Sequence, residues 1–364
     1  MVSPLHFARR TLSLLTHHPF TLPVLILMPH SRCNCRCVMC DIWKANTRQQ
    51  EISPEVLARH LGDMRALGVR QVVFSGGEAL MHSNLWRLAA MLHEGGIGIT
   101  LLSTGLLLKE HAVEITRFCS DVIVSLDGHA PVHDAIRRIP RAFDQLSEGV
   151  LALRRVSPGF PITARSVVQR ANFRTLKQTI LAAEALGLDQ ISFLAADTSS
   201  SAFNREGRVA DDQVERVALT AAEARELAGV ITEVVGELWP LFSRGFVAES
   251  QEKLRRIPQY YLALQGEAEL PPVRCNAPWV SAVVEADGTV RPCFFHRGLG
   301  NIHDTPLGEI VGGPAAVSFR RDLDVTRDPT CRRCVCTLEL RPHVRVGPGP
   351  LETLRRLVRA QGRE

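Results

Sequence analysis

Hydrophobic residues in the first half of the chain recur in short runs that alternate with segments of helical periodicity. One such segment is SPEVLARHLGDMRALG, in which Ser53 is a typical N-cap and Gly68 follows the last turn. The runs are short and rich in β-branched residues, which is typical of buried strands. The sequence therefore predicts six strands, namely VLILMP (24–29), QVVFS (71–75), ITLLS (99–103), DVIVSLD (121–127), ITARSVV (162–168) and ISFLA (191–195).

Six strand-then-helix units predict parallel strands joined by crossover helices. A complete barrel of this kind has eight units. A partial barrel and an open doubly wound sheet remain the two choices, and of these we expect an α/β fold with a partial (β/α)6 TIM-like barrel.

The pattern changes after Ala210. The stretch DDQVERVALTAAEARELAGVITEVVGELWPLF predicts one long helix, a second helix is expected near 252–264, and VSAVVEADGTVRPCFF predicts a β-hairpin that turns at Asp287-Gly288. A double proline in ELPPVRC marks a boundary between these parts. We therefore expect a lead-in helix at 1–21, the barrel at 22–200, a helical connector at 201–270, a small C-terminal α+β cluster-binding domain at 271–345 and a helix or tail at 346–364.

Composition adds few constraints. The 364 residues are 45% hydrophobic and 22% charged, as in a globular protein, and the net charge of +5 is too diffuse to indicate nucleic acid as a partner. A basic pair precedes apolar residues near the N-terminus, but His17, His18 and two prolines interrupt them. No stretch reaches the roughly 20 apolar residues that a membrane span needs. We expect no membrane association and a cytoplasmic location.

Four of the ten cysteines lie in CNCRCVMC. In a reducing compartment, clustered cysteines indicate metal binding or catalysis rather than disulfides. Cys33, Cys37 and Cys40 form a C-x3-C-x2-C group, whereas structural zinc usually takes two separated pairs. Three thiolates can hold three irons of a [4Fe–4S] cluster and leave the fourth iron open. Cys35 fits no second register and Cys119 is predicted to be a core thiol; a zinc knuckle is the alternative for the other three.

This spacing directly after the first strand resembles the radical SAM superfamily, and further matches extend over about residues 22–196. SGGEALM resembles the GGE segment that contacts the amino group of S-adenosylmethionine (SAM), and Ser103 and Thr104 (LSTG) lie where the family places further SAM contacts. Met39 and Ala79 depart from the common aromatic and proline, and both changes are tolerable. The resemblance implies SAM contacts from Gly76, Gly77, Glu78, Ser103, Ser125, Asp127 and Arg165.

The resemblance also implies the chemistry. An electron donated by a flavodoxin- or ferredoxin-type protein reduces the cluster, SAM is cleaved to methionine and a 5′-deoxyadenosyl radical, and the radical abstracts a hydrogen atom from the substrate. Glycines let a backbone approach a ligand closely, and β/α folds place their sites at the carboxyl ends of the strands, where all these residues fall.

The remaining five cysteines lie in the last third of the chain. The segment RCNAPWVSAVVEADGTVRPCFFHRGLGNI, followed by CRRCVC, resembles the SPASM or shorter twitch extension of radical SAM enzymes. Five cysteines are too few for two further clusters. We expect one auxiliary [4Fe–4S] cluster on Cys275, Cys293, Cys331 and Cys334, with Cys336 as an alternative to Cys334 and a zinc ribbon as the alternative site.

A fully ligated auxiliary cluster suits electron transfer, so the resemblance implies a radical SAM oxidoreductase that oxidises a small molecule such as a sugar or aminocyclitol. His133 and Arg137 in HDAIRR are candidate substrate contacts, with a solvated segment as the alternative. A peptide-modifying maturase, and a redox-neutral transferase or decarboxylase with a structural second metal site, remain open. An electron-transfer or scaffold protein would not explain the GGE segment.

Overall fold

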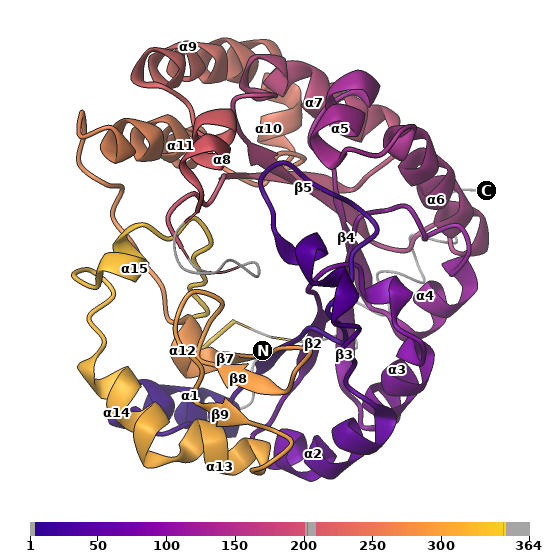
Figure 1. The fold of residues 1–364 in the computed structure, drawn as a ribbon, viewed down its shortest axis with the longest axis vertical. Coiled ribbons are helices and arrows are strands. Elements are labelled where there is room, and N and C mark those ends of the chain that lie inside the picture. Colours follow the sequence, from indigo (N-terminus) through magenta and orange to yellow (C-terminus); the bar gives the residue numbers. More distant parts are fainter. Residues whose placement is uncertain (1–3, 201, 203–208, 345, 347–364) are drawn as a thin grey trace.

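The computed structural model describes residues 4–200, 202, 209–344 and 346. Its nine-stranded sheet has the order β6-β5-β4-β3-β2-β1-β7-β8-β9, and each neighbouring pair among β1 to β6 is parallel. The predicted partial (β/α)6 barrel is thereby confirmed (Figure 1). The six strands are β1 (Val24–Leu27), β2 (Gln71–Phe74), β3 (Gly98–Ser103), β4 (Asp121–Ser125), β5 (Ile162–Val168) and β6 (Gln190–Ala195).

The two faces of the barrel strands differ. Alternate side chains such as Leu25, Val72 and Ile99 are completely buried in the main hydrophobic core, which the outer helices cover. The residues between them, such as Ile26 and Val73, line a cavity inside the barrel. This period of two follows from the pleat of a strand, and it gives the barrel a packed outer layer and an open interior.

Helices on the outside connect the strands. Ser53 caps α2 (Pro54–Ala66) by accepting a hydrogen bond from the amide of Val56 at 3.2 Å, as its place in the sequence predicts. The helices of this part are α1 (Pro4–Thr16), η1 (Ile42–Thr47), α2 (Pro54–Ala66), η2 (Ala79–Met81), α3 (Leu85–Glu94), α4 (Ala112–Phe118), α5 (Ala130–Arg137), α6 (Ala142–Val156), η3 (Phe173–Thr175) and α7 (Leu176–Ala185).

The prediction of one long helix from Asp211 is wrong. The segment is helical but is divided into α8 (Asp211–Val217), α9 (Ala221–Glu237) and α10 (Trp239–Ser243). Thr220 and Glu223 form a reciprocal capping box that starts a new helix. Pro240 lies in the first turn of α10, where a missing amide costs no helical hydrogen bond. The next helix, α11 (Gln251–Leu264), lies where it is predicted.

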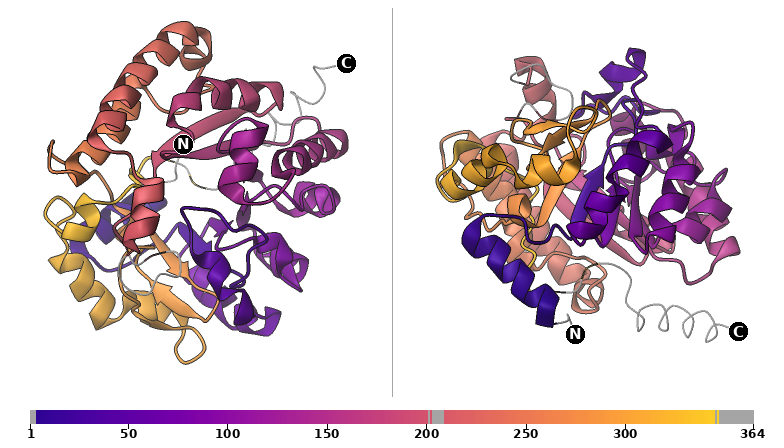
Figure 2. Two further views of the ribbon diagram at one scale, coloured as in Figure 1. Left: turned by 45° about the horizontal axis from the view of Figure 1, so that its top comes forward. Right: turned by 90° about the horizontal axis from the view of Figure 1, so that it is seen from below.

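The part beyond α11 continues the barrel sheet. β7 (Ser281–Val284) pairs in parallel with β1, and β8 (Thr289–Arg291) returns antiparallel as the predicted hairpin. This region, coloured orange to yellow, closes one side of the barrel (Figures 1 and 2). Its other elements are α12 (Ala277–Val280), β9 (Gly300–Asn301), α13 (Leu307–Gly312), α14 (Pro314–Asp322) and α15 (Pro329–Arg332).

The predicted helix or tail at 346–364 lies, apart from Val346, outside the described residues. None of the helices that the structure describes combines the length and apolarity needed to cross a bilayer.

Candidate active site

The glycines of the GGE segment pack directly against the first cysteine loop. Gly76 has a φ of +101°, and a side chain on Gly77 would place its Cβ 2.0 Å from the carbonyl oxygen of Arg32 and 3.0 Å from Cβ of Cys33. The amide of Glu78 also donates to that Arg32 oxygen at 3.0 Å. Only a glycine permits this approach, so the segment supports the loop that carries the cysteines.

Hydrogen bonds hold the backbone at or beside each of the three predicted cluster ligands. Asn46 accepts a hydrogen bond from the amide of Cys33 at 2.9 Å and donates to its carbonyl at 3.0 Å. The indole of Trp43 donates to the carbonyl of Cys40 at 2.9 Å. Cys37 lies between two backbone hydrogen bonds from its loop neighbours to the end of α5. The loop is therefore fixed at all three positions.

The thiols of this loop are electrostatically distinct. Cys35 is buried, and hydrogen bonds with Cys33 and Cys37, together with burial, raise the pKa of its thiol. The hydrogen bond with Cys35 and the positive charge of Arg137 lower the pKa of Cys37 to about 6. A thiol that favours the thiolate, in a set of soft sulfur donors, fits an iron–sulfur cluster.

The structure brings Glu78 and Ser103 together. The carboxylate of Glu78 is completely buried and accepts hydrogen bonds from the Ser103 hydroxyl at 3.0 Å, from the amide and hydroxyl of Thr104 at 2.6 Å and from the amide of Leu80 at 3.2 Å. Burial raises the pKa of Glu78, while these donors favour the charged form. A contact of this carboxylate with SAM stays a prediction.

Asp127, His133 and Arg137 form a second buried group. Asp127 and Arg137 form a close ion pair, and the amide of Asp127 donates to Nδ1 of His133 at 3.2 Å. Burial and the charge of Arg137 lower the pKa of His133 to about 3, so its ring is neutral at ordinary pH. Neither residue lines the barrel cavity, and neither is solvated as the alternative would require. Nε2 of His133 is buried without a hydrogen-bond partner among the described residues, so a substrate contact of these two residues stays a prediction.

Ser125 and Arg165 are adjacent in the register of β4 and β5. Arg165 lines the cavity and donates to the hydroxyl of Ser192 at 3.3 Å. Gln169, just beyond β5, is completely buried, and among the described residues neither polar atom of its side chain has a hydrogen-bond partner. A buried amide without partners is what a bound ligand would satisfy, and no motif in the sequence marks this residue.

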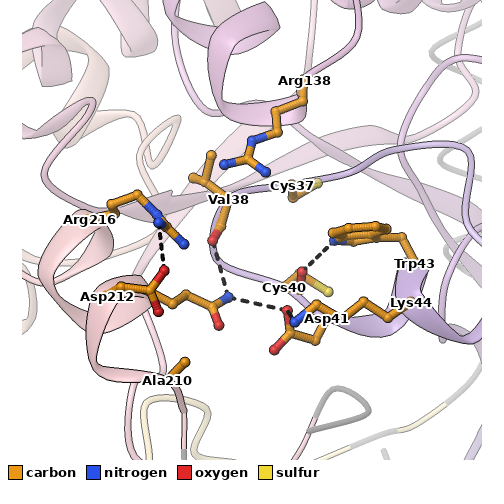
Figure 3. A pocket seen from close by; sticks show the side chains of 11 residues that line it. Cys37, Val38, Cys40, Asp41, Trp43, Lys44, Arg138, Ala210, Asp212 and Arg216 are labelled. Atoms are coloured by element: carbon orange, nitrogen blue, oxygen red, sulfur yellow. Dashed lines mark hydrogen bonds and ion pairs between the residues drawn. The ribbon is translucent and has the colours of Figure 1, made fainter.

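A pocket of about 120 Å³ opens beside Cys37 and Cys40 (Figure 3). Gln213 of α8 crosses to the cysteine loop, where it donates to the carbonyl of Val38 at 3.2 Å and to Asp41 at 3.4 Å. Lys44, Arg138 and Arg216 also line the pocket. The outer side of the first cysteine group is therefore accessible and carries charges of both signs, since Asp41 and Asp212 pair there with Lys44 and Arg216.

The cavity inside the barrel, about 430 Å³ in volume, brings the second cysteine group together. Inward-facing barrel residues form one wall, and the C-terminal region forms the other. The cysteines that line it are Cys275, Cys293, Cys331, Cys334 and Cys336.

Burial is the main cause that raises the pKa of Cys293 to about 11, and it also raises the pKa values of Cys331 and Cys334. Neighbouring cysteines raise all three further. Thiols that resist ionisation together need a cation to compensate their charge, as a metal or cluster site provides.

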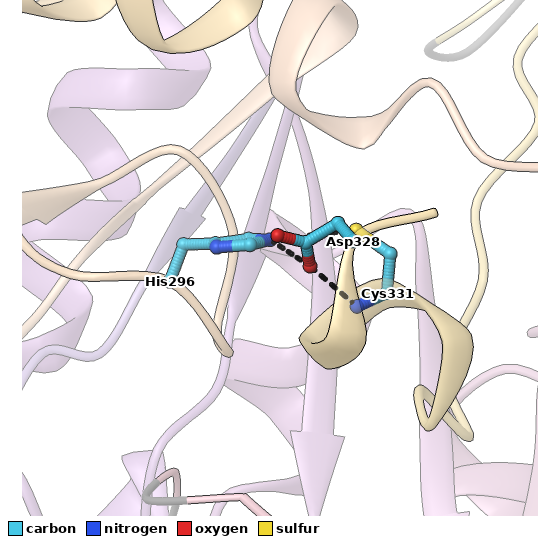
Figure 4. Close-up of side chains that lie close together, drawn as sticks. All are labelled: His296, Asp328 and Cys331. Carbon is cyan, nitrogen blue, oxygen red and sulfur yellow. Dashed lines mark hydrogen bonds and ion pairs between the residues drawn. The ribbon is translucent and has the colours of Figure 1, made fainter. Parts of the chain in front are cut away.

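His296 and Asp328 lie beside Cys331 (Figure 4). Nε2 of His296 is 3.4 Å from Sγ of Cys331 and 3.8 Å from a carboxylate oxygen of Asp328. Asp328 caps α15 by accepting from the amide of Cys331 at 2.8 Å. These three residues could also hold a single metal ion. His296 was not predicted from the sequence, although it follows Cys293 by only three residues.

The model of the radical SAM superfamily matches residues 27–183, and that of the iron–sulfur cluster-binding SPASM domain matches residues 275–335. An Fe-coproporphyrin III synthase of Methanosarcina barkeri is 25% identical over 330 residues, which cover 86% of this chain and 80% of that protein. A PqqA peptide cyclase of Ruegeria pomeroyi is 26% identical over 334 residues, which cover 87% and 80%.

Two solved structures share the fold. Streptococcus suis SuiB bound to S-adenosylmethionine has a TM-score of 0.61 at 15% identity and covers 89% of this chain and 74% of its own. Native anSMEcpe with bound AdoMet has a TM-score of 0.61 at 17% identity, with coverages of 85% and 86%. These two likenesses concern the fold, and the two family models, which together match more than half of the chain, show that it belongs to the radical SAM superfamily and carries a SPASM iron–sulfur domain.

Proposed function

We propose that this radical SAM enzyme oxidises a substrate held in the barrel cavity. The observation that carries the proposal is the cavity itself, whose walls are the inward faces of the barrel strands and all five C-terminal cysteines. A molecule bound there would lie against the group of thiols that can hold an electron acceptor. When bound, a [4Fe–4S] cluster and SAM supply a 5′-deoxyadenosyl radical that abstracts a hydrogen atom.

The residues proposed to hold the first cluster are Cys33, Cys37 and Cys40. Hydrogen bonds fix the loop backbone at or beside each of them, and cysteine thiolates are the usual ligands of iron–sulfur clusters. Gly76 and Gly77 would hold SAM through their backbone, and Arg165 offers a cation inside the cavity. Glu78, Ser103 and Asp127 already have protein partners, so we propose that they act mainly by fixing the strand ends. Ser125 remains a proposed contact.

The second group is proposed to hold one further [4Fe–4S] cluster. Oxidation of a substrate removes one hydrogen atom, one electron and one proton, and the radical takes only the hydrogen atom. The SPASM thiols could hold the group that takes the electron, and the proton passes to water. Cys334 and Cys336 both lie near enough to Cys275 for its charge to raise their pKa values, but Cys334 is the one that forms a C-x2-C pair with Cys331. We therefore propose Cys275, Cys293, Cys331 and Cys334 as the ligands.

The lining of the cavity favours a substrate with an apolar group over a sugar or aminocyclitol. Val24, Ile26, Leu102 and Ile123 offer no hydrogen bonds, and one group of polar side chains in the lining consists of Arg165, Ser192, Glu249 and Lys253. A polyhydroxylated molecule would lose its hydrogen bonds to water against the apolar wall. Peptide modification is the second candidate, supported by the name of the PqqA peptide cyclase relative.

The first experiment measures iron and sulfide per chain after anaerobic reconstitution, together with 5′-deoxyadenosine formed from SAM under dithionite. We expect about eight irons in the wild type and about four in the Cys33/Cys37/Cys40→Ala variant, with formation of 5′-deoxyadenosine abolished. If the wild type held about four irons and the variant none, the C-terminal cysteines would hold no iron–sulfur cluster, and the proposed oxidation would have no electron acceptor. Undiminished SAM cleavage in the variant would contradict the assignment of the first site. We expect a reduced flavodoxin- or ferredoxin-type protein to support formation of 5′-deoxyadenosine in place of dithionite.

A further inference from the structure

The guanidinium of Arg137 lies buried between the first cysteine loop and the end of β4. Arg137 is the last residue of α5 and is 6% exposed. Its Nη1 donates to Sγ of Cys37 at 3.4 Å, and its Nη2 forms the close ion pair with Asp127. One side chain therefore connects a cysteine of the C-x3-C-x2-C group to a strand end of the barrel.

Asp127 is itself held rigidly. Its Oδ1 accepts from the amide of Val167 at 2.8 Å, and Asn172 donates to its carbonyl at 2.9 Å. The carboxylate is completely buried, so it has no alternative partner in solvent. The ion pair consequently fixes the orientation of the guanidinium toward the sulfur.

The backbone of α5 adds a second restraint on Cys37. The carbonyls of Ile136 and Arg137 accept hydrogen bonds from the amides of Val38 and Arg36, both at 3.1 Å. The last carbonyls of a helix have no partners within the helix, and here the cysteine loop supplies them. Cys37 is thus held on both sides at a fixed distance from the guanidinium.

We propose that Arg137 is a positioning residue of the SAM-binding cluster, in which its guanidinium donates to the Cys37 sulfur and raises the reduction potential of that cluster. The inference rests on the proposed ligand set. A positive charge and a hydrogen bond at a ligand sulfur stabilise the state that has one more electron. Asp127 offsets part of this charge while it orients the guanidinium. Arginine remains protonated at every relevant pH, so the effect is permanent.

The test is a redox titration followed by electron paramagnetic resonance on anaerobically reconstituted protein without SAM. The signal of the first cluster is identified beforehand as the one that SAM addition perturbs. In Arg137→Gln, the ratio of reduced to oxidised cluster at a fixed potential should fall about tenfold, which is about 59 mV for a one-electron couple. The matched control is Arg141→Gln, because Arg141 is an exposed arginine that pairs only with Asp144 among the described residues; its potential should not change.

Arg137→Gln leaves Asp127 buried without its cation, which destabilises the fold. The double variant Asp127→Asn/Arg137→Gln removes both charges and should keep a lowered potential. Arg137→Lys keeps the charge and should lie between wild type and Arg137→Gln. Loss of the first cluster from Arg137→Gln but not from Arg137→Lys also supports the inference.

The inference is overturned if the double variant keeps its full iron content and its ratio of reduced to oxidised cluster at the fixed potential differs from that of the wild type by less than about twofold. Loss of the cluster from Arg137→Lys as well overturns it too, because the fold rather than the charge then requires the arginine. A wild type that shows no SAM-sensitive signal contradicts the proposed function instead. The two failures are therefore distinguishable.

Discussion

The two groups of cysteines differ in how the protein holds their thiols. In the first group, Cys33, Cys37 and Cys40 lie on one loop after β1, and Asn46, Trp43 and the end of α5 fix the backbone of that loop. In the second group, the cysteines come from segments far apart in the sequence and meet at the wall of the barrel cavity. The first group is organised by hydrogen bonds to the backbone of one loop, and the second by the packing of a whole domain.

The electrostatic surroundings of the two groups also differ. The pKa of Cys37 is lowered to about 6, whereas that of Cys293 is raised to about 11. Arg137 donates to the first group directly, whereas Arg165 is the cation that acts on Cys336 in the second. The protein thus prepares the first group to bind a cluster, while the second depends on the cluster itself to compensate its charge.

The largest effect is expected from Gly77→Ala. Its Cβ would lie 2.0 Å from a backbone oxygen, so the cysteine loop must move. We expect the variant to lose about four of eight irons and nearly all formation of 5′-deoxyadenosine, while the second group keeps its iron. Gly62→Ala is the control, since nothing lies within 4 Å of a Cβ there. Loss of iron from both groups would show that they are not independent.

A smaller effect, confined to the second group, separates Cys334 from Cys336. We expect Cys334→Ala to lose about four irons and to keep reductive SAM cleavage, because the first loop is untouched. Cys336→Ala should keep its full iron content. Iron analysis and Mössbauer spectra of the two variants check this, and the opposite pattern would assign Cys336 as the ligand.

Local patterns allowed much of the fold to be predicted from the sequence. The six barrel strands lie where their β-branched runs are, and Ser53 caps α2 as expected. The break after α8 was also readable, because Thr220 and Glu223 in TAAE form the usual capping-box pattern. It was missed because the apolar periodicity continues across it.

The arrangement of the site could not be predicted in the same way. The pairing of β7 with β1 depends on contacts between residues more than 250 positions apart, and no local pattern encodes it. The same holds for the ion pair that turns Arg137 toward Cys37 instead of the substrate cavity. Sequence motifs identified which residues matter, whereas their partners depend on the tertiary fold.

His133 makes the folded protein sensitive to acid. Its pKa is about 3 in the folded protein and 6.5 in the unfolded chain, so protonation favours unfolding as the pH falls below about 6.5. Between pH 7 and pH 5 the wild type should lose about 2 kcal/mol more stability than His133→Asn, whose side-chain oxygen can still accept from Asp127. Urea unfolding of the apoprotein at both values measures this. Equal losses would mean that His133 is protonated in the native state.

The smallest effect is expected from Asn46→Ala. This change removes the hydrogen bonds that hold Cys33 and leaves those that hold the backbone around Cys37 and Cys40. Two hydrogen bonds are lost, and because Cys33 and Asn46 are only half-buried, water can replace part of them, so the cost is about 1 kcal/mol. Chelators should then remove iron from the first group about fivefold faster. The rate for the second group should not change, because its cysteines depend on domain packing. A change in both rates would mean that the first loop also supports the SPASM domain.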